Sequence, residues 1–167
     1  LSEGQVEKIV EEHGRWLAGN GGERANMQGS CLESIRLEGV DLRRADLRQV
    51  RLIDSQLQGA NLAGVDLGQA NLMEAYLNKA NLQEANLQEA DLEEANLLGA
   101  DLHEADLRRA NLTLTNLRKA DLSYAVLTAA KIRGADLRGV ILDRTNLREV
   151  DLDHVSPEGV DLSAAIR

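Results

Sequence analysis

The chain has 167 residues, which fits one domain, and hydrophobic residues make up 43% of it while charged residues make up 28%. Aromatic residues contribute only 2%, so the core has to be built mainly from Leu, Ala and Val, and a single Cys excludes an intramolecular disulfide or a cysteine metal cluster. The net charge of −9 disfavours nonspecific attraction to nucleic acid or to an anionic membrane, and without an apolar run of about 18 residues or a basic leader we expect a cytoplasmic protein.

Residues 1–24 lie outside the repeat that fills the rest of the chain, and they predict one amphipathic helix. Ser2 and Gln5 have the spacing of a capping box, and Gly19 is in position to end the helix. An apolar stripe at helical spacing is made of Val6, Ile9, Val10, His13 and Leu17, with Trp16 beside it. We expect this helix to cover the first apolar layer of the repeat, which otherwise exposes Leu side chains and a free strand edge. The alternative is a helix that is offered to a partner.

A five-residue period runs through the rest of the chain. From Met27 to Leu152 every fifth residue is Leu, apart from Met27 itself and Ile132. A small residue, usually Ala, stands two positions before each Leu, and Asp or Asn usually lies between them. Successive leucines would lie about 140° apart on an α-helix and on opposite faces of a flat strand. The period therefore predicts a solenoid, in which the small residue and the Leu point inward and the two residues after the Leu turn a corner.

Glycines at one place in the repeat indicate how many units form a turn. Many glycines occupy the second residue after the Leu, which we call the corner position. Five of them recur at multiples of 20 residues: Gly39, Gly59, Gly99, Gly139 and Gly159. This column predicts one corner that repeatedly needs positive φ or a close backbone approach. It favours four five-residue units per turn.

The run from Ala80 to Leu92, Ala-Asn-Leu-Gln-Glu-Ala-Asn-Leu-Gln-Glu-Ala-Asp-Leu, resembles the pentapeptide-repeat proteins, and the resemblance spans roughly residues 25–165. It implies an all-β solenoid, a right-handed quadrilateral β-helix with about seven coils of four pentapeptides. Similar N-terminal helices with a His-x-x-Trp-Leu stretch, here His13 to Leu17, precede the repeats in some bacterial members. We therefore expect a capping helix and loop over residues 1–24 and a β-helix over residues 25–167.

The sequence predicts no enzyme and no cofactor. His13, His103 and His154 lie far apart and have no Cys or carboxylate partners at metal-ligand spacing. A nucleophile elbow, a phosphate-binding glycine loop and a dinucleotide fingerprint are all missing from the sequence. Asp and Asn recur because the repeat needs a short polar residue that bonds its own backbone, and a filled solenoid leaves no concave pocket. We predict no catalytic, cofactor-binding or metal-binding residue.

Charge is distributed unevenly along the repeat. From Glu74 to Asp106, nine acidic residues stand against Lys79, a net charge of −8, whereas residues 107–148 carry nine basic and three acidic residues, a net charge of +6. The candidate partner surface is the acidic waist, made of Glu84, Glu89, Glu93, Glu94 and Glu104. The alternative is a solvated surface of mixed charge. Ile53 and Met73 stand 20 residues apart, and with Leu114 in register they predict a small apolar patch.

The function predicted from these features is a noncatalytic rigid scaffold for protein–protein interaction, with no direct nucleic-acid or membrane binding. The alternative comes from the resemblance, because some quinolone-resistance members imitate duplex DNA and occupy the DNA site of gyrase. This chain departs from them in three ways: Leu replaces their central Phe, their C-terminal dimerisation module is not recognisable, and the +6 segment spoils a phosphate-like field.

The C-terminal end predicts an exposed apolar layer. Pro157 interrupts the Leu column there, and no second helix follows to cover the last leucines. These leucines are Leu142, Leu147, Leu152 and Leu162. Either the final turn folds over this layer or a second copy covers it, and end-to-end homodimerisation is the partner prediction for this end.

Overall fold

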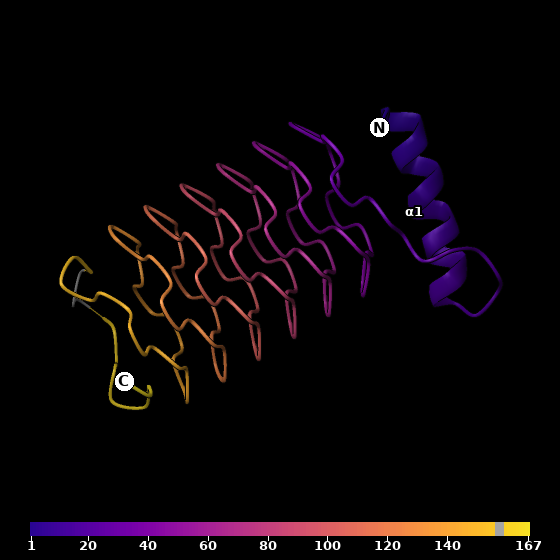
Figure 1. Cartoon of the computed structure of the whole chain (residues 1–167). Coiled ribbons are helices and arrows are strands. Elements are labelled where there is room, and N and C mark those ends of the chain that lie inside the picture. The colour runs from indigo at the N-terminus through magenta and orange to yellow at the C-terminus, as the bar shows by residue number, and fades with distance from the viewer. Residues whose placement is uncertain (156–158) are drawn as a thin grey trace.

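The computed structural model describes residues 1–155 and 159–167. It shows one helix, α1, lying against the end of a column of stacked turns, with the two chain termini at opposite ends of the molecule (Figure 1). α1 spans Glu3–Leu17, and the turns begin a few residues later. Pro157, which we predicted to interrupt the Leu column, lies outside the described residues.

The signals that predicted the start and end of α1 are present in the structure. The Gln5 N–H donates to Ser2 Oγ at 3.3 Å, and the Ser2 N–H donates to Gln5 Oε1 at 2.8 Å, which completes the capping box. At the other end, Gly19 has φ 71° and donates its N–H to the Trp16 carbonyl at 3.1 Å. The Asn20 N–H donates to the Arg15 carbonyl at 2.9 Å, which makes this end a Schellman motif.

The solenoid is held together by parallel bridges between residues that lie 20 positions apart. They run from the Asn26–Asp46 bridge to the Asn146–Ile166 bridge. Twenty residues hold four pentapeptides, so each turn has four sides. Each side contributes a single bridged residue rather than a long strand, because the chain begins the next corner almost at once.

Each side of an inner turn makes three backbone hydrogen bonds with the following turn, donating two of them and accepting one. On the side that contains Leu92, the Leu92 N–H donates to the Asn111 carbonyl at 2.7 Å. The Asn111 N–H donates back to the Ala90 carbonyl at 2.9 Å, and the Glu94 N–H donates to the Thr113 carbonyl at 3.0 Å. Because an isolated turn lacks these partners, the stability of the solenoid is a property of neighbouring turns.

Every corner has the same backbone conformation. From Gly29 to Glu149 each corner residue has φ between 54° and 71°, and the Leu carbonyl accepts the N–H three residues on, as in a type II turn. Eighteen of these residues are not glycine, although the left-handed region costs an L-residue roughly 1–2 kcal/mol. The corner N–H, which bonds to the next turn, offsets this cost.

The glycine column indicated the right spacing for the wrong reason. All four corners need positive φ, so the corner with the glycines is not special in its backbone. A Cβ at Gly39, Gly59 or Gly99 would meet no atom within 4 Å, so close approach does not require glycine there either. Nothing in the structure explains why glycine prevails at this corner.

The interior is a column of Leu side chains lined by Ala, as the repeat predicted. Leu77, Leu82 and Leu92 are fully buried, with 0% exposure, and the Ala positions beside them are equally closed. The short polar residue before each Leu bonds its own backbone, for example at Asp101, whose Oδ1 accepts the His103 N–H at 3.1 Å. This bond accounts for the abundance of Asp and Asn in the repeat.

α1 packs on the first turn through Val6 and through His13, which is fully buried. The Ala25 N–H donates to His13 Nδ1 at 3.0 Å, and His13 Nε2 lies 3.1 Å from the Arg43 carbonyl oxygen. Because a backbone N–H can only donate, Nδ1 carries no proton and Nε2 donates to Arg43. Burial lowers the pKa of His13, in agreement with a neutral ring. Trp16 stacks on this ring with the centroids 5.4 Å apart.

The C-terminal turn is less closed than the inner turns. Leu142 and Leu147 are 4% and 5% exposed, whereas Leu152 and Leu162 are only half-buried. The last bridge brings Ile166 beside Asn146, and the Ile166 side chain stays exposed.

Candidate functional site

The outer surface consists of columns in which residues 20 positions apart lie on successive turns. This register follows directly from the bridges. Four of the columns occupy the corners, and we name each by one member: the Glu84, Glu89, Glu94 and Lys79 corners. The repeat fixes the backbone of every corner, so a partner would meet side chains at regular places on a rigid support.

The acidic waist is continuous in the sequence but occupies three corners of the solenoid. Glu84 and Glu104 belong to the same corner on successive turns, and Glu89 belongs to the next corner along the chain. Glu93 and Glu94 lie at the third. The fourth corner carries Lys79, Gly99 and Lys119. The waist is therefore a band around much of the solenoid, and its use as a partner surface stays a prediction.

Three glutamates of the waist contact neighbouring side chains. Glu89 accepts a hydrogen bond from Gln69 Nε2 at 3.0 Å and lies 3.6 Å from Arg109 Nη1. Glu93 Oε2 accepts from Asn111 Nδ2 at 3.1 Å. Glu104 Oε1 lies 3.3 Å from His103 Nε2. These contacts run mostly between turns, so they fix the carboxylates in the columns.

Two of the nine basic residues in the segment beyond the waist, Arg108 and Arg138, are paired within their own repeats. In an Asp-Leu-Arg unit, the Asp and the Arg lie on the same outer face with the buried Leu between them. Arg108 Nε donates to Asp106 Oδ1 at 2.9 Å, and Arg138 Nε donates to Asp136 Oδ1 at 2.8 Å. The Arg138 hydrogen bond lowers the pKa of Asp136 to about 2. These two arginines are therefore held beside the carboxylate of their own repeat.

Ile53 and Met73 share one outward column on successive turns, and both are half-buried. Leu114, which the prediction added to this pair, belongs to the Glu94 corner, two turns beyond Met73. The turn that carries Glu94 separates it from Met73, so Leu114 is not part of the predicted patch. A Cβ at Gly134 would lie 2.8 Å from Leu114 Cδ2, because the Leu114 side chain lies over that glycine.

An aromatic cluster that the sequence analysis missed lies at the Glu84 corner. Tyr124 is 44% exposed, its ring meets His103 edge to face with the centroids 5.3 Å apart, and Arg144 Cζ lies 5.6 Å from the ring centroid. The corner therefore reads Glu84, Glu104, Tyr124 and Arg144 on successive turns. These four residues stand 20 positions apart in the sequence, so their alignment could have been predicted from that spacing.

Residues 1–155 and 159–167 are the part of the chain that the structure describes. In this part of the chain, no three His, Cys, Asp or Glu side chains are grouped so as to hold a metal ion. None of its helices is both long and apolar enough to span a membrane. Cys31 is a free, exposed thiol.

Several solved structures are similar to this chain. A solved structure with similarity to the chain is HetL, a pentapeptide repeat protein involved in heterocyst differentiation regulation from the cyanobacterium Nostoc; it is 36% identical over 84% of this chain and 68% of that chain, with a TM-score of 0.45. Rfr23 from the cyanobacterium Cyanothece is 25% identical over 81% and 99%, with a TM-score of 0.41. QnrB1, a plasmid-mediated fluoroquinolone resistance protein, is 17% identical over 86% and 85%, with a TM-score of 0.44.

Among functionally curated proteins, none matches the sequence. A family model described as pentapeptide repeats matches in eight copies, over residues 23–57, 55–93, 85–123 and 120–156. These matches cover most of the chain, and the 20-residue bridge register of the β-helix solenoid agrees with them. The chain belongs to the pentapeptide repeat family.

Proposed function

We propose that this chain is a noncatalytic scaffold that binds a protein partner on the outer columns of a right-handed quadrilateral β-helix, covered at its N-terminal end by α1. The observation that carries the proposal is the Glu84 corner. It presents two carboxylates, a tyrosine and an arginine in one line, and contacts with His103 and Arg144 hold the Tyr124 ring. Tyrosine and arginine are enriched among the residues that dominate binding energy at protein interfaces.

Affinity capture from the native host tests the proposal with two variants. One changes the five glutamates of the acidic waist to Gln, and the other is Tyr124→Ala. A matched control changes Glu11, Glu23 and Glu149 to Gln, which removes exposed acids outside the waist. We expect a captured partner to be lost with either test variant and kept with the control. A partner that binds the wild type and both variants equally would contradict the proposal.

We do not extend the proposal to DNA mimicry. A mimic of duplex DNA needs a uniform negative field, whereas Lys79 and Lys119 occupy the fourth corner and Arg144 follows the two glutamates of the Glu84 corner. We expect no effect of the protein in a gyrase supercoiling assay. Inhibition or protection of gyrase at micromolar protein would restore DNA mimicry and displace the scaffold proposal.

We also propose that two copies pair end to end through the C-terminal turn. Leu152 shares its inward column with Leu92, and Leu162 shares its column with Leu102, but only the inner two leucines are fully buried. A second copy would remove the remaining apolar surface from water. Light scattering that shows a monomer at high concentration would contradict this pairing.

A further inference from the structure

On the first turn, the side that contains Arg36 is one of those whose outer backbone hydrogen-bonding groups are open. Within the described chain, the N–H and carbonyl of Arg36 and the carbonyl of Glu38 take part in no hydrogen bond. One turn later, the equivalent groups of Gln56 and Gln58 make three hydrogen bonds to the first turn, of 2.7 to 2.9 Å. This side can therefore accept a further strand with three hydrogen bonds, as every inner side does.

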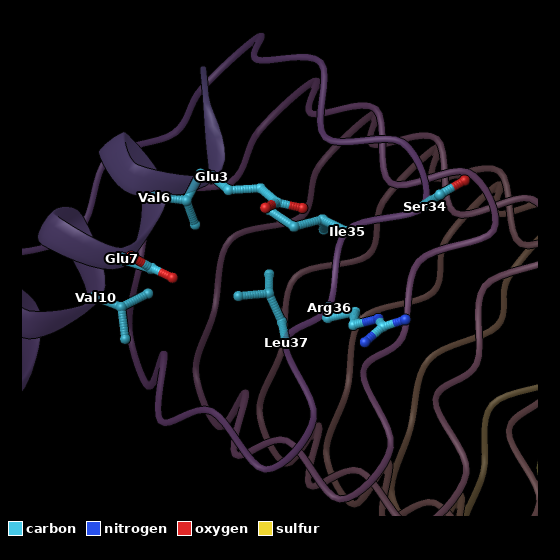
Figure 2. A pocket seen from close by; sticks show the side chains of 8 residues that line it. All are labelled: Glu3, Val6, Glu7, Val10, Ser34, Ile35, Arg36 and Leu37. Carbon is cyan, nitrogen blue, oxygen red and sulfur yellow. The ribbon is translucent and has the colours of Figure 1, made fainter.

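α1 leaves this side uncovered. A hollow of about 540 Å³ lies between α1 and the first turn, with Val6 and Val10 on the helix facing Ile35 and Leu37 across it (Figure 2). Leu37 is only half-buried, whereas Leu77 in the same inward column is fully buried. If another turn preceded the first turn, its inward Leu would stack on Leu37. The hollow is apolar at that place.

Charged side chains from both α1 and the first turn surround the hollow. The Glu3 and Glu7 side chains extend from α1 toward the hollow (Figure 2). On the open side of the first turn, the outward residues are Arg36 and Glu38, with Leu37 between them. In the solenoid, a residue stacks on its equivalent 20 positions away, so a strand added in register would place one side chain over Arg36 and another over Glu38.

We propose that an extended segment of a partner protein adds to this side as a parallel strand, a case of β-augmentation. Its small residue lies over Ile35 and its Leu over Leu37, which fills the hollow. An acidic residue between them pairs with Arg36, and basic residues after the Leu face Glu38 and Glu7. The segment therefore has the form Ala-Asp-Leu-Arg-Lys. This site is separate from the acidic waist, so it can fail without the scaffold proposal failing.

The direct test measures binding of a blocked peptide, Val-Ala-Asp-Leu-Arg-Lys, to the whole protein by calorimetry. The control peptide is methylated at the Leu nitrogen, because that N–H donates to the Arg36 carbonyl in the proposed register. Methylation removes this hydrogen bond and leaves the Arg36 carbonyl buried without a donor, which weakens binding by about tenfold or more. Equal binding of the two peptides would overturn the proposal.

Charge variants on α1 provide a matched pair. Glu7 lines the hollow and Glu11 does not, and both are exposed on the same helix. We expect Glu7→Lys to weaken peptide binding severalfold and Glu11→Lys to leave it unchanged. An equal effect of the two variants would overturn the proposed site.

Hydrogen exchange locates the bound peptide. The Arg36 and Cys31 N–H groups are both open on the first turn, but only Arg36 lines the hollow. The peptide should slow exchange at Arg36 and leave Cys31 unchanged. Binding without protection of Arg36 would contradict the proposal. A protein dimer that resists the peptide and is dissociated by Glu7→Lys would instead identify a second copy as the occupant.

Discussion

His13 links α1 to the solenoid through two hydrogen bonds, and the one that it accepts from the Ala25 N–H requires a neutral ring. A proton on Nδ1 would face the Ala25 N–H, which is also a donor. Burial is the main reason that the pKa of His13 is lowered, and the charges of Arg24 and Arg43 act in the same direction. The Asp41 carboxylate and the hydrogen bond to the Arg43 carbonyl act against them, without reversing the shift.

The lowered pKa predicts that acid loosens the contact between α1 and the first turn. The unfolded chain binds a proton at His13 near pH 6.5 and the folded chain only at lower pH, so stability is complete above about pH 6.5 and falls as the pH drops below it. We expect the melting temperature to fall more steeply between about pH 7.5 and about pH 5 for the wild type than for His13→Gln. Because His103 and His154 are present in both proteins, the difference between the two slopes reports on His13 alone. Equal pH slopes would contradict this assignment.

The Asp136–Arg138 pair makes a small contribution to stability that depends on more acidic pH. The Arg138 hydrogen bond lowers the pKa of Asp136 from 3.8 to about 2, so this contribution is present above pH 3.8 and is lost as the pH falls toward 2. Asp136→Asn should flatten the decline of the melting temperature over that range. Asp143→Asn is the control, because Asp143 is exposed and its side chain makes no ion pair among the described residues. Two identical acid profiles would contradict this prediction.

At the scale of the elements, Gly22 determines how the connection from α1 reaches the first turn. Its φ is 81°, and a Cβ there would lie 2.2 Å from the Glu12 carbonyl oxygen and 3.0 Å from the Trp16 nitrogen. Both atoms belong to the helix backbone, which cannot move without displacing α1. Gly21 has φ 80°, but a Cβ there would meet only the end of the Arg15 side chain at 3.8 Å.

These two glycines separate backbone strain from steric overlap. Gly21→Ala introduces only left-handed strain, about 1–2 kcal/mol, which lowers the melting temperature by roughly 2–8 °C. Gly22→Ala adds the overlap with α1, so we expect a clearly larger loss, together with faster hydrogen exchange at Ala25. Equal melting temperatures for the two variants would show that the connection can adjust.

The elements differ in how far the sequence could predict them. Ser2, Gln5 and Gly19 marked the ends of α1 because capping is local chemistry, and the Leu period indicated the solenoid because every unit repeats the same packing. The angle of α1 across the first turn is a tertiary property, so the hollow beside Leu37 was not predictable. The Tyr124 cluster was predictable in principle, because the 20-residue spacing stacks Tyr124 on Glu104, and His103 is the residue before Glu104.

At the scale of the whole molecule, an inward Leu and an outward Leu should respond differently to the same change. Leu92 is fully buried in the middle of the solenoid, whereas Leu98 is an outward, half-buried leucine six residues later. Leu92→Lys buries an uncompensated charge between two turns, so we expect loss of the cooperative fold. Leu98→Lys should shift stability by about 0.5 kcal/mol or less. A circular-dichroism melt of Leu92→Lys within a few degrees of the wild type would contradict the packing.

The 20-residue bridge register has a consequence for how such a protein changes by duplication within its gene. Copying 20 residues inserts a complete layer, lengthens the molecule and leaves each column aligned above and below the insertion. Copying five residues preserves the Leu interior equally well, but it rotates the whole downstream surface by one face. Length and surface pattern can therefore be altered separately, by events that differ only in the size of the copied segment.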